Sequence, residues 1–343
     1  MGDQGGGETM RRWMRAALLV VLVAGMSGGA MAQAQKEPGR LQGSPQLPEG
    51  VEAISLLGRP LRSAPPAEAQ RAELESRLAE AGAAVEARPN DPEAVVWLGR
   101  RTAYLGRYRE AIAIYTEGIG KFPKYAALYR HRGHRYITVR ELDNAIADLD
   151  RAAALTAGTP DEVEPDGIPN ARNTPTSTLQ SNIWYHLGLA RYLKGDFAGA
   201  LAAYRECMKR SKNADMQVAT SHWLYMTLRR MGREAEARQV LEPITPQMDI
   251  IENGSYHRLL LMYKGVLTAE ELLAQASGGT EIATIGYGVA NWHFYNGRRE
   301  QGLELMRKVV SGETWAAFGF IAAEADLARE EPRKSVPAIG ATH

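Results

Sequence analysis

The amino-acid sequence predicts an all-α fold in which helical segments recur in tandem. Three observations support this prediction. Small residues recur at a fixed period, since Gly99 and Gly133 are 34 residues apart, and so are Ala111 and Ala145. Between them, apolar residues follow at intervals of three and four, which is the spacing of one helix face. Proline, glycine and asparagine interrupt these stretches, as expected where one helix ends and the next begins.

The N-terminal segment has the features of an export signal. Three arginines precede an apolar run over residues 16–26, and small residues around Ala32 follow. A short apolar run between basic and small residues is typical of a cleavable signal peptide, and it falls short of the ~20 apolar residues that span a membrane. We therefore expect residues 1–32 to be a signal peptide cleaved near Ala32. The protein would then be exported, periplasmic or secreted, without stable membrane insertion, and its start is either Met1 or Met10.

Charge and cysteine content limit the classes of function. The chain has 41 basic and 40 acidic residues, and removal of residues 1–32 leaves 38 of each. A neutral chain lacks the excess positive charge of nucleic-acid binders, so we expect no nucleic-acid partner. The single cysteine, Cys207, follows Leu201 and Tyr204 on a predicted helix, which favours a packing role over catalysis.

The first elements after the signal are a linker and a single helix. Residues 33–65 are rich in Pro, Gly, Ser and Gln, a composition that buries too little apolar surface to order a chain, so a disordered linker is predicted. Helix formers dominate from residue 66 onward, and we expect an N-terminal capping helix within residues 66–91. Pro89 and Pro92 end this stretch, because proline cannot continue a helix.

The repeats follow the capping helix, and one insertion separates them. Two repeats are predicted over residues 92–156, and two more over residues 181–248. The intervening residues 157–180 contain several prolines and glycines and are expected to leave the stack as a loop. Residues 249–329 are expected to hold degenerate helical repeats and a last capping helix with a polar outer face, before a disordered tail over residues 330–343.

These residues resemble the tetratricopeptide repeat family. In the third copy, Leu187 and Gly188 match the first helix of its motif, and Ala200 and Tyr204 match the small and aromatic positions of the second. Small residues let two helices approach closely, and each pair needs its neighbours to cover its apolar faces. Over residues 92–310, the resemblance implies a right-handed superhelical solenoid of antiparallel helix pairs.

The resemblance also implies a binding surface. In this family the concave groove is lined mainly by the first helix of each pair, and its ligands are extended peptides or partner helices. The positions carried over to this sequence are Arg100, Tyr104, Arg130, His134, Thr138, Tyr185, Leu189, Tyr192, His222, Met226 and Arg229. Arginine binds carboxylates through paired hydrogen bonds and tyrosine offers a large rigid contact, so we expect an acidic or carboxylate-bearing peptide. The Lys and Asn set with which some members hold a C-terminal carboxylate is not present at matching positions.

Few residues are candidates for catalysis or metal binding. His131 and His134 are three apart on one predicted helix and could share a face. Arg132 lies between them, however, and a guanidinium repels a divalent cation. The acidic residues within 161–166 lack the alternation and the glycine of an EF-hand loop. We therefore expect no catalytic residue, no metal site and no cofactor.

The function that these observations favour is a non-enzymatic protein- or peptide-binding scaffold or adaptor of the cell envelope. One alternative is an accessory or catalytic protein, whose separate C-terminal helical region from Asp249 would include His257, Trp292 and His293. Another is an architectural component of an envelope assembly. The sequence leaves the partner and the oligomeric state open.

Overall fold

The computed structural model describes residues 47–330, and every structural statement below concerns this part of the chain. The predicted signal peptide and nearly all of the predicted tail lie outside the described residues, as does the linker before residue 47. The described part contains 14 α-helices and one two-stranded antiparallel sheet. The prediction of an all-α fold is confirmed.

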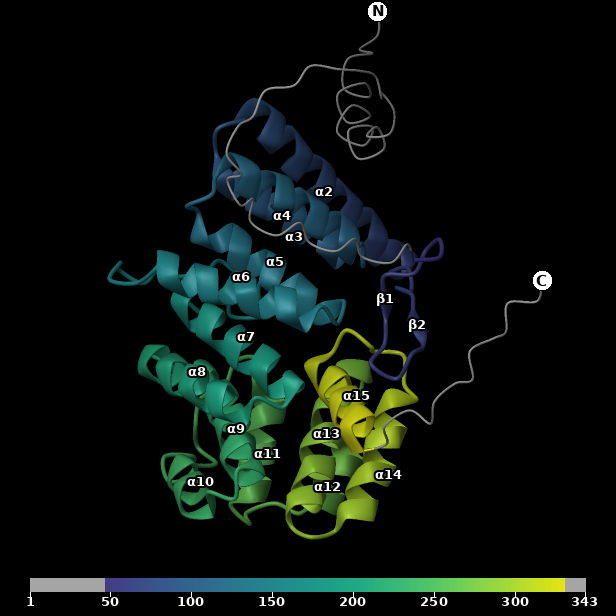
Figure 1. Cartoon of the computed structure of the whole chain (residues 1–343), viewed down its shortest axis with the longest axis vertical. Helices are drawn as coiled ribbons and strands as arrows, with labels where there is room; N and C mark the ends of the chain where they lie inside the picture. The colour runs from purple at the N-terminus through teal and green to yellow at the C-terminus, as the bar shows by residue number, and fades with distance from the viewer. Residues whose placement is uncertain (1–46, 331–343) are drawn as a thin grey trace, which may run out of the picture. The chain divides into compact units, whose positions relative to one another are not determined.

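Figure 1 shows the helices in chain order. Their bounds are α2 (Glu68–Ala87), α3 (Pro92–Tyr104), α4 (Tyr108–Lys121), α5 (Ala126–Thr138), α6 (Leu142–Leu155), α7 (Leu179–Lys194), α8 (Phe197–Arg210), α9 (Ala214–Arg230), α10 (Glu234–Leu241), α11 (Gly254–Tyr263), α12 (Ala269–Gln275), α13 (Gly279–Tyr295), α14 (Arg299–Val310) and α15 (Phe318–Glu330).

Successive helices pair, and the pairs stack in order. The most extensive contacts are within the pairs α3 and α4, α5 and α6, α7 and α8, and α13 and α14. The first helices of neighbouring pairs also touch one another, α3 against α5, α5 against α7, and α7 against α9. They form an inner layer, so side chains on their free sides share one concave face.

The recurring glycines mark where the two helices of a pair cross. A Cβ on Gly99 would lie 2.3 Å from a ring atom of Tyr115, and one on Gly188 would lie 2.7 Å from the ring of Tyr204. Both tyrosines are almost fully buried. A large ring from the second helix therefore fills the space that a side chain on the first would need, which explains why glycine stands at these crossings.

Arg140 stands at a backbone position that glycine occupies in the neighbouring repeats. The turn within a pair uses a left-handed residue, Gly106 with φ 77° and Gly195 with φ 83°, and Arg140 has φ 66°. Left-handed backbone costs an L side chain about 1–2 kcal/mol. The Arg140 side chain pairs with Glu324 at 2.9 Å and donates to the Trp315 carbonyl at 2.8 Å, so it connects the second repeat to the C-terminal helix.

The region before α2 differs from the predicted disordered linker. Strands β1 (Ala53–Ile54) and β2 (Pro60–Leu61) form a hairpin, in which Ala53 faces Leu61. Every second residue from Val51 to Ser55 is buried, which is the alternation of a strand with one covered face. Arg59 donates to the Val310 carbonyl at 2.8 Å, so the hairpin is fastened to the C-terminal helices.

Helix α15 differs from the predicted capping helix with a polar outer face. All its residues from Gly319 to Leu327 are buried, and it packs against α7, α13 and α14. Its acidic residues Glu324 and Asp326 are fully buried, and Asp326 pairs with Arg230 at 3.1 Å. The helix therefore fills the inside of the stack instead of closing one end of it.

The insertion between the second and third repeats is a loop whose ends pair with each other. Val163 forms an antiparallel bridge with Thr178, the Glu164 amide donates to the Ser177 carbonyl at 3.1 Å, and the Leu179 amide donates to the Glu162 carbonyl at 2.8 Å. The insertion was predicted to extend away from the stack, but its central residues contact the inner face of α3 and α5.

Candidate functional site

The groove residues predicted from the sequence lie on the inner layer, but they do not form one open surface. Eight of the eleven are buried, and Tyr104, His134 and Arg229 are partly exposed. Segments of the same chain cover them. The insertion covers Arg100 and Arg130 on α3 and α5, whereas α15 and the helices after α9 cover His134 on α5 and the group on α7 and α9.

The C-terminal group belongs to the interior of the stack. The Phe318 ring lies 5.4 Å from that of His134 and 6.4 Å from that of Tyr185. Tyr192 is fully buried and shares a 2.8 Å hydrogen bond between hydroxyls with Tyr287, which in turn donates to Asp326 at 2.9 Å. The remaining members, Thr138, Leu189 and Met226, are also buried, at 2% exposure or less.

His222 and Arg229 complete this interior group. His222 is stacked between Tyr256 at 4.7 Å and Tyr263 at 5.9 Å between ring centroids. Burial lowers the pKa of His222 to about 3, so its imidazole is neutral. The Arg229 guanidinium lies 4.6 Å above the Tyr295 ring and donates to Asn296 at 2.7 Å. None of these side chains is free to bind a peptide while α11 to α15 are in place.

The N-terminal group is covered only by the insertion, specifically by the strap, which we define as residues 161–168. Arg100 donates to the Pro165 carbonyl at 2.9 Å, and Arg101 donates to the Gly167 carbonyl at 2.7 Å. Arg130 forms an ion pair with Glu164 at 2.9 Å, and both side chains are at least nine-tenths buried. Guanidinium groups on two adjacent helices thus bind two main-chain carbonyls and one carboxylate of an extended segment.

Trp97 and Arg101 also belong to this face, although they are not among the groove residues predicted from the sequence. Trp97 lies beneath both arginines, with the Arg100 guanidinium 4.3 Å and the Arg101 guanidinium 4.8 Å from its ring centroid. Such stacking holds a guanidinium flat and directs its donors to one side. The available signal was helical spacing, because residues three and four apart on a helix share a face.

Histidines beside this face stay neutral. Burial lowers the pKa of His131 well below its usual value, and the charges of Arg130 and Arg100 lower it further. The rings of His134 and His186 lie 4.3 Å apart between centroids and are tilted by 41°, and burial lowers the pKa of each well below its usual value. The positive charge of the face therefore comes from its arginines.

A cavity of about 280 Å³ opens between the strap and the inner layer. Its wall includes Arg100, Tyr104 and Arg130 from the helices, Glu164 from the strap, and Glu252 from the segment before α11. Glu252 accepts hydrogen bonds from Thr176 and Asn170, at 2.8 Å and 2.7 Å. The cavity is polar and solvent can enter beside the strap.

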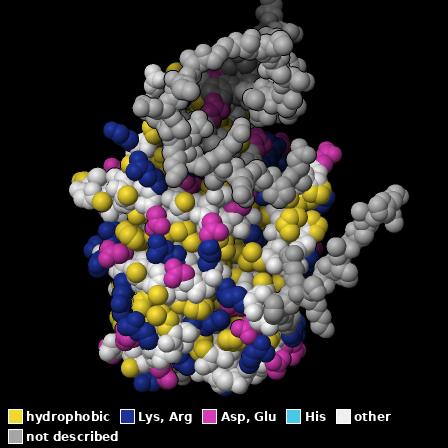
Figure 2. Space-filling view, viewed as in Figure 1, with side chains coloured by type: hydrophobic (Ala, Val, Ile, Leu, Met, Phe, Trp, Pro, Cys, Tyr) yellow, Lys and Arg dark blue, Asp and Glu magenta, His cyan; other side chains and the backbone are white. Residues whose placement is uncertain are grey.

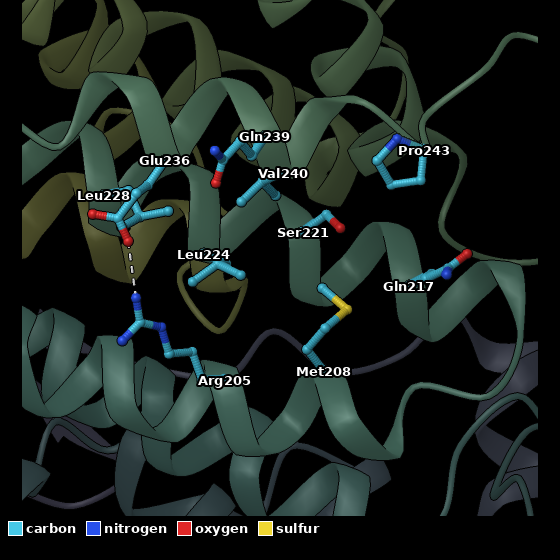
Figure 3. Close-up of a pocket in the computed structure, with 10 residues that line it drawn as sticks. All are labelled: Arg205, Met208, Gln217, Ser221, Leu224, Leu228, Glu236, Gln239, Val240 and Pro243. Atoms are coloured by element: carbon cyan, nitrogen blue, oxygen red, sulfur yellow. Dashed lines mark hydrogen bonds and ion pairs between the residues drawn. The ribbon is translucent and has the colours of Figure 1, made fainter.

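A second concavity, of about 310 Å³, lies on the outer side between α8, α9 and α10 (Figure 3). Met208, Leu224 and Val240 point into it, and the ion pair of Arg205 with Glu236 at 2.9 Å crosses one end. Nothing in the described residues indicates what would cover it. On the face in Figure 2, basic and acidic side chains are interspersed with apolar ones.

The remaining histidines and the single cysteine take part in local packing and hydrogen bonds within residues 47–330. No three His, Cys, Asp or Glu side chains there gather in a way that could hold a metal ion. Cys207 is buried against Thr220, and burial raises the pKa of its thiol to about 11, which leaves it protonated. His257 bonds to the Thr245 carbonyl, and His293 accepts from Arg298, which follows α13. Among the described helices, none is long and apolar enough to cross a bilayer.

Helix pairs in tandem, with small residues at their crossings, define a helical repeat protein. A family model for the tetratricopeptide repeat matches residues 181–213, which include α7 from Ser181 onward and all of α8. The matched segment, which is the third helix pair of the stack, is a tetratricopeptide repeat. Stacked repeats of this kind create extended concave surfaces for protein interaction.

Solved structures of low similarity are also helical repeat proteins. YrrB, described as a TPR protein with an unusual peptide-binding site, is 14% identical, and the match covers 73% of this chain and 97% of that chain at a TM-score of 0.39. A tetratricopeptide repeat protein from Parabacteroides merdae is 13% identical over 75% of this chain and 94% of that chain, at a TM-score of 0.43. At these scores the likenesses carry no argument about function. No curated protein matches the chain.

Proposed function

We propose that this chain is a non-enzymatic adaptor of the cell envelope whose first two repeats bind an acidic, extended segment of a partner protein. The observation that carries the proposal is the set of Arg100, Arg101 and Arg130, which bind carbonyl and carboxylate oxygens of an extended strand of the chain's own insertion. Arginine forks suit this acceptor chemistry, because their donors are planar and permanently charged.

Of the predicted groove residues, this proposal retains Arg100, Tyr104 and Arg130 on α3 and α5. The residues on α7 and α9 lie inside the stack, whereas Arg100 and Tyr104 line a cavity at its edge. The partner segment would replace the strap on α3 and α5, with a carboxylate at Arg130 and main-chain carbonyls at Arg100 and Arg101. Export through the N-terminal signal is part of the proposal, and the basic, apolar and small residues before Gln33 support it.

Affinity capture from the native envelope tests the binding proposal. We expect the chain purified from the envelope fraction to begin near Gln33 by mass spectrometry. With this chain as bait, the double variant Arg100→Ala/Arg101→Ala should lose a partner that the unmodified chain retains. The matched control is Arg238→Ala, which removes an exposed arginine on α10 and should retain the partner. Equal recovery by all three baits, or a full-length chain confined to the cytosol, would refute the corresponding half of the proposal.

A further inference from the structure

The strap already presents the kind of ligand for which the inner face of the first repeats is suited. Three acceptors lie within four residues of an extended segment: the Glu164 carboxylate, the Pro165 carbonyl and the Gly167 carbonyl. Each meets an arginine of α3 or α5.

The contacts of the strap are incomplete where they are most deeply buried. One carboxylate oxygen of Glu164 and the Nε of Arg130 are buried and have no hydrogen-bond partner, although the two side chains are paired through their other atoms. A buried charged group with an unmatched atom is costly, so another acidic segment with better geometry would bind more favourably. The strap is a weak occupant of this face.

The strap is also built to move away as a unit. It contains no helix, and its large apolar residues Val163 and Ile168 are 63% and 60% exposed, so they add little to its seating. The insertion beyond the strap is held at the surface, where Arg172 pairs with Asp249. Few buried apolar contacts and exposed anchors are the properties of segments that open locally while the rest of a protein stays folded.

We propose that the strap is an internal competitor, which occupies the arginine face of α3 and α5 until an acidic extended segment of a partner displaces it. This inference rests on the proposed function and adds a regulatory step to it. Only the open form binds a partner. The apparent affinity is therefore the intrinsic affinity multiplied by the fraction of molecules in which the strap is open.

Gly167 provides a way to disturb the strap without substituting a residue of the face beneath it. A Cβ on this residue would lie 1.6 Å from the Tyr104 hydroxyl and 2.8 Å from a terminal nitrogen of Arg100. Gly167→Ala therefore requires the strap to move away or the ends of these two side chains to shift. Gly120→Ala is the matched control, because a Cβ there meets nothing within 4 Å. Glu164→Lys opens the strap by a different route, since it places a second cation beside Arg130.

The test measures binding of a labelled peptide with the sequence of residues 161–168, added to the full chain and followed by fluorescence anisotropy. We expect Gly167→Ala and Glu164→Lys each to bind it at least tenfold more tightly than the unmodified chain and Gly120→Ala do. Addition of Arg100→Ala to Gly167→Ala should abolish the gain. Hydrogen exchange at the Glu164 and Leu179 amides, which the bridge of the insertion protects, should accelerate in both opening variants.

Affinities within twofold of the unmodified chain in both opening variants would overturn the inference. This failure is distinguishable from that of the proposed function, because envelope capture that depends on Arg100 and Arg101 would stand without any competition from the strap. Conversely, tighter peptide binding in the opening variants together with arginine-independent capture would retain the internal competitor and reject the proposed partner site.

Discussion

At the scale of single residues, the inner layer shows how ionisable groups are buried in this fold. His222 is enclosed by aromatic rings and stays neutral, whereas Glu324 and Asp326 are buried in ion pairs with arginines. A neutral imidazole costs less to bury than a charged one, and a buried carboxylate needs a partner. Whether an ionisable side chain is buried neutral or in an ion pair depends on residues far away in the sequence.

The neutral state of His222 predicts a pH-dependent stability. Its pKa is lowered to about 3 in the folded chain, so the unfolded chain binds the extra proton once the pH falls below about 6.5. The neutral imidazole therefore contributes to the free energy of unfolding above that pH. This contribution is lost on acidification, by about 1.4 kcal/mol between pH 7.5 and 5.5. His222→Phe should lose less stability than the unmodified chain over this interval, by about that amount, in urea denaturation at both pH values. Equal losses would show that the imidazole is not neutral in the folded state.

At the scale of elements, the sequence predicts the helix pairs well because their signals are local. The spacing of Gly99 and Gly133, and the small and aromatic positions of the third copy, reflect contacts within one pair. The buried position of α15 could not be predicted from local signals, because an acidic residue such as Glu324 suggests an exposed helix face. Its partner Arg140 lies 184 residues earlier, and a single sequence does not reveal such a pair.

At Arg140, the ion pair with Glu324 should stabilise the fold by more than the left-handed backbone of this residue costs. Arg140→Gly should relieve left-handed strain of roughly 1 kcal/mol but leave Glu324 buried without its partner, at a cost of about 3–5 kcal/mol. We expect a net loss of about 2–4 kcal/mol in the free energy of unfolding at pH 7, by urea denaturation. The double variant Arg140→Gly/Glu324→Gln should recover part of this loss. A stabilised Arg140→Gly chain would mean that the pair contributes nothing.

At the scale of the whole molecule, the described residues form a repeat stack whose inner face is largely covered by its own chain. The hairpin, the strap and α15 were each predicted as peripheral, from composition or from position between and after the repeats. The strand alternation at Val51, Ala53 and Ser55 was a usable signal for the hairpin. For the strap, the acidic residues were visible in the sequence, but the arginines that bind Glu164 and its neighbours belong to other elements. The uncovered part of the groove is therefore smaller than the resemblance alone implied.

Hydrogen exchange of the full chain, alone and with its captured envelope partner bound, tests the central claim most directly. Binding should slow amide exchange in α3 and α5 and accelerate it over residues 161–179, where the strap is released. A partner that slows exchange only around α8 to α10, and leaves α3, α5 and the strap unchanged, would contradict the assignment of the arginine face as the binding surface.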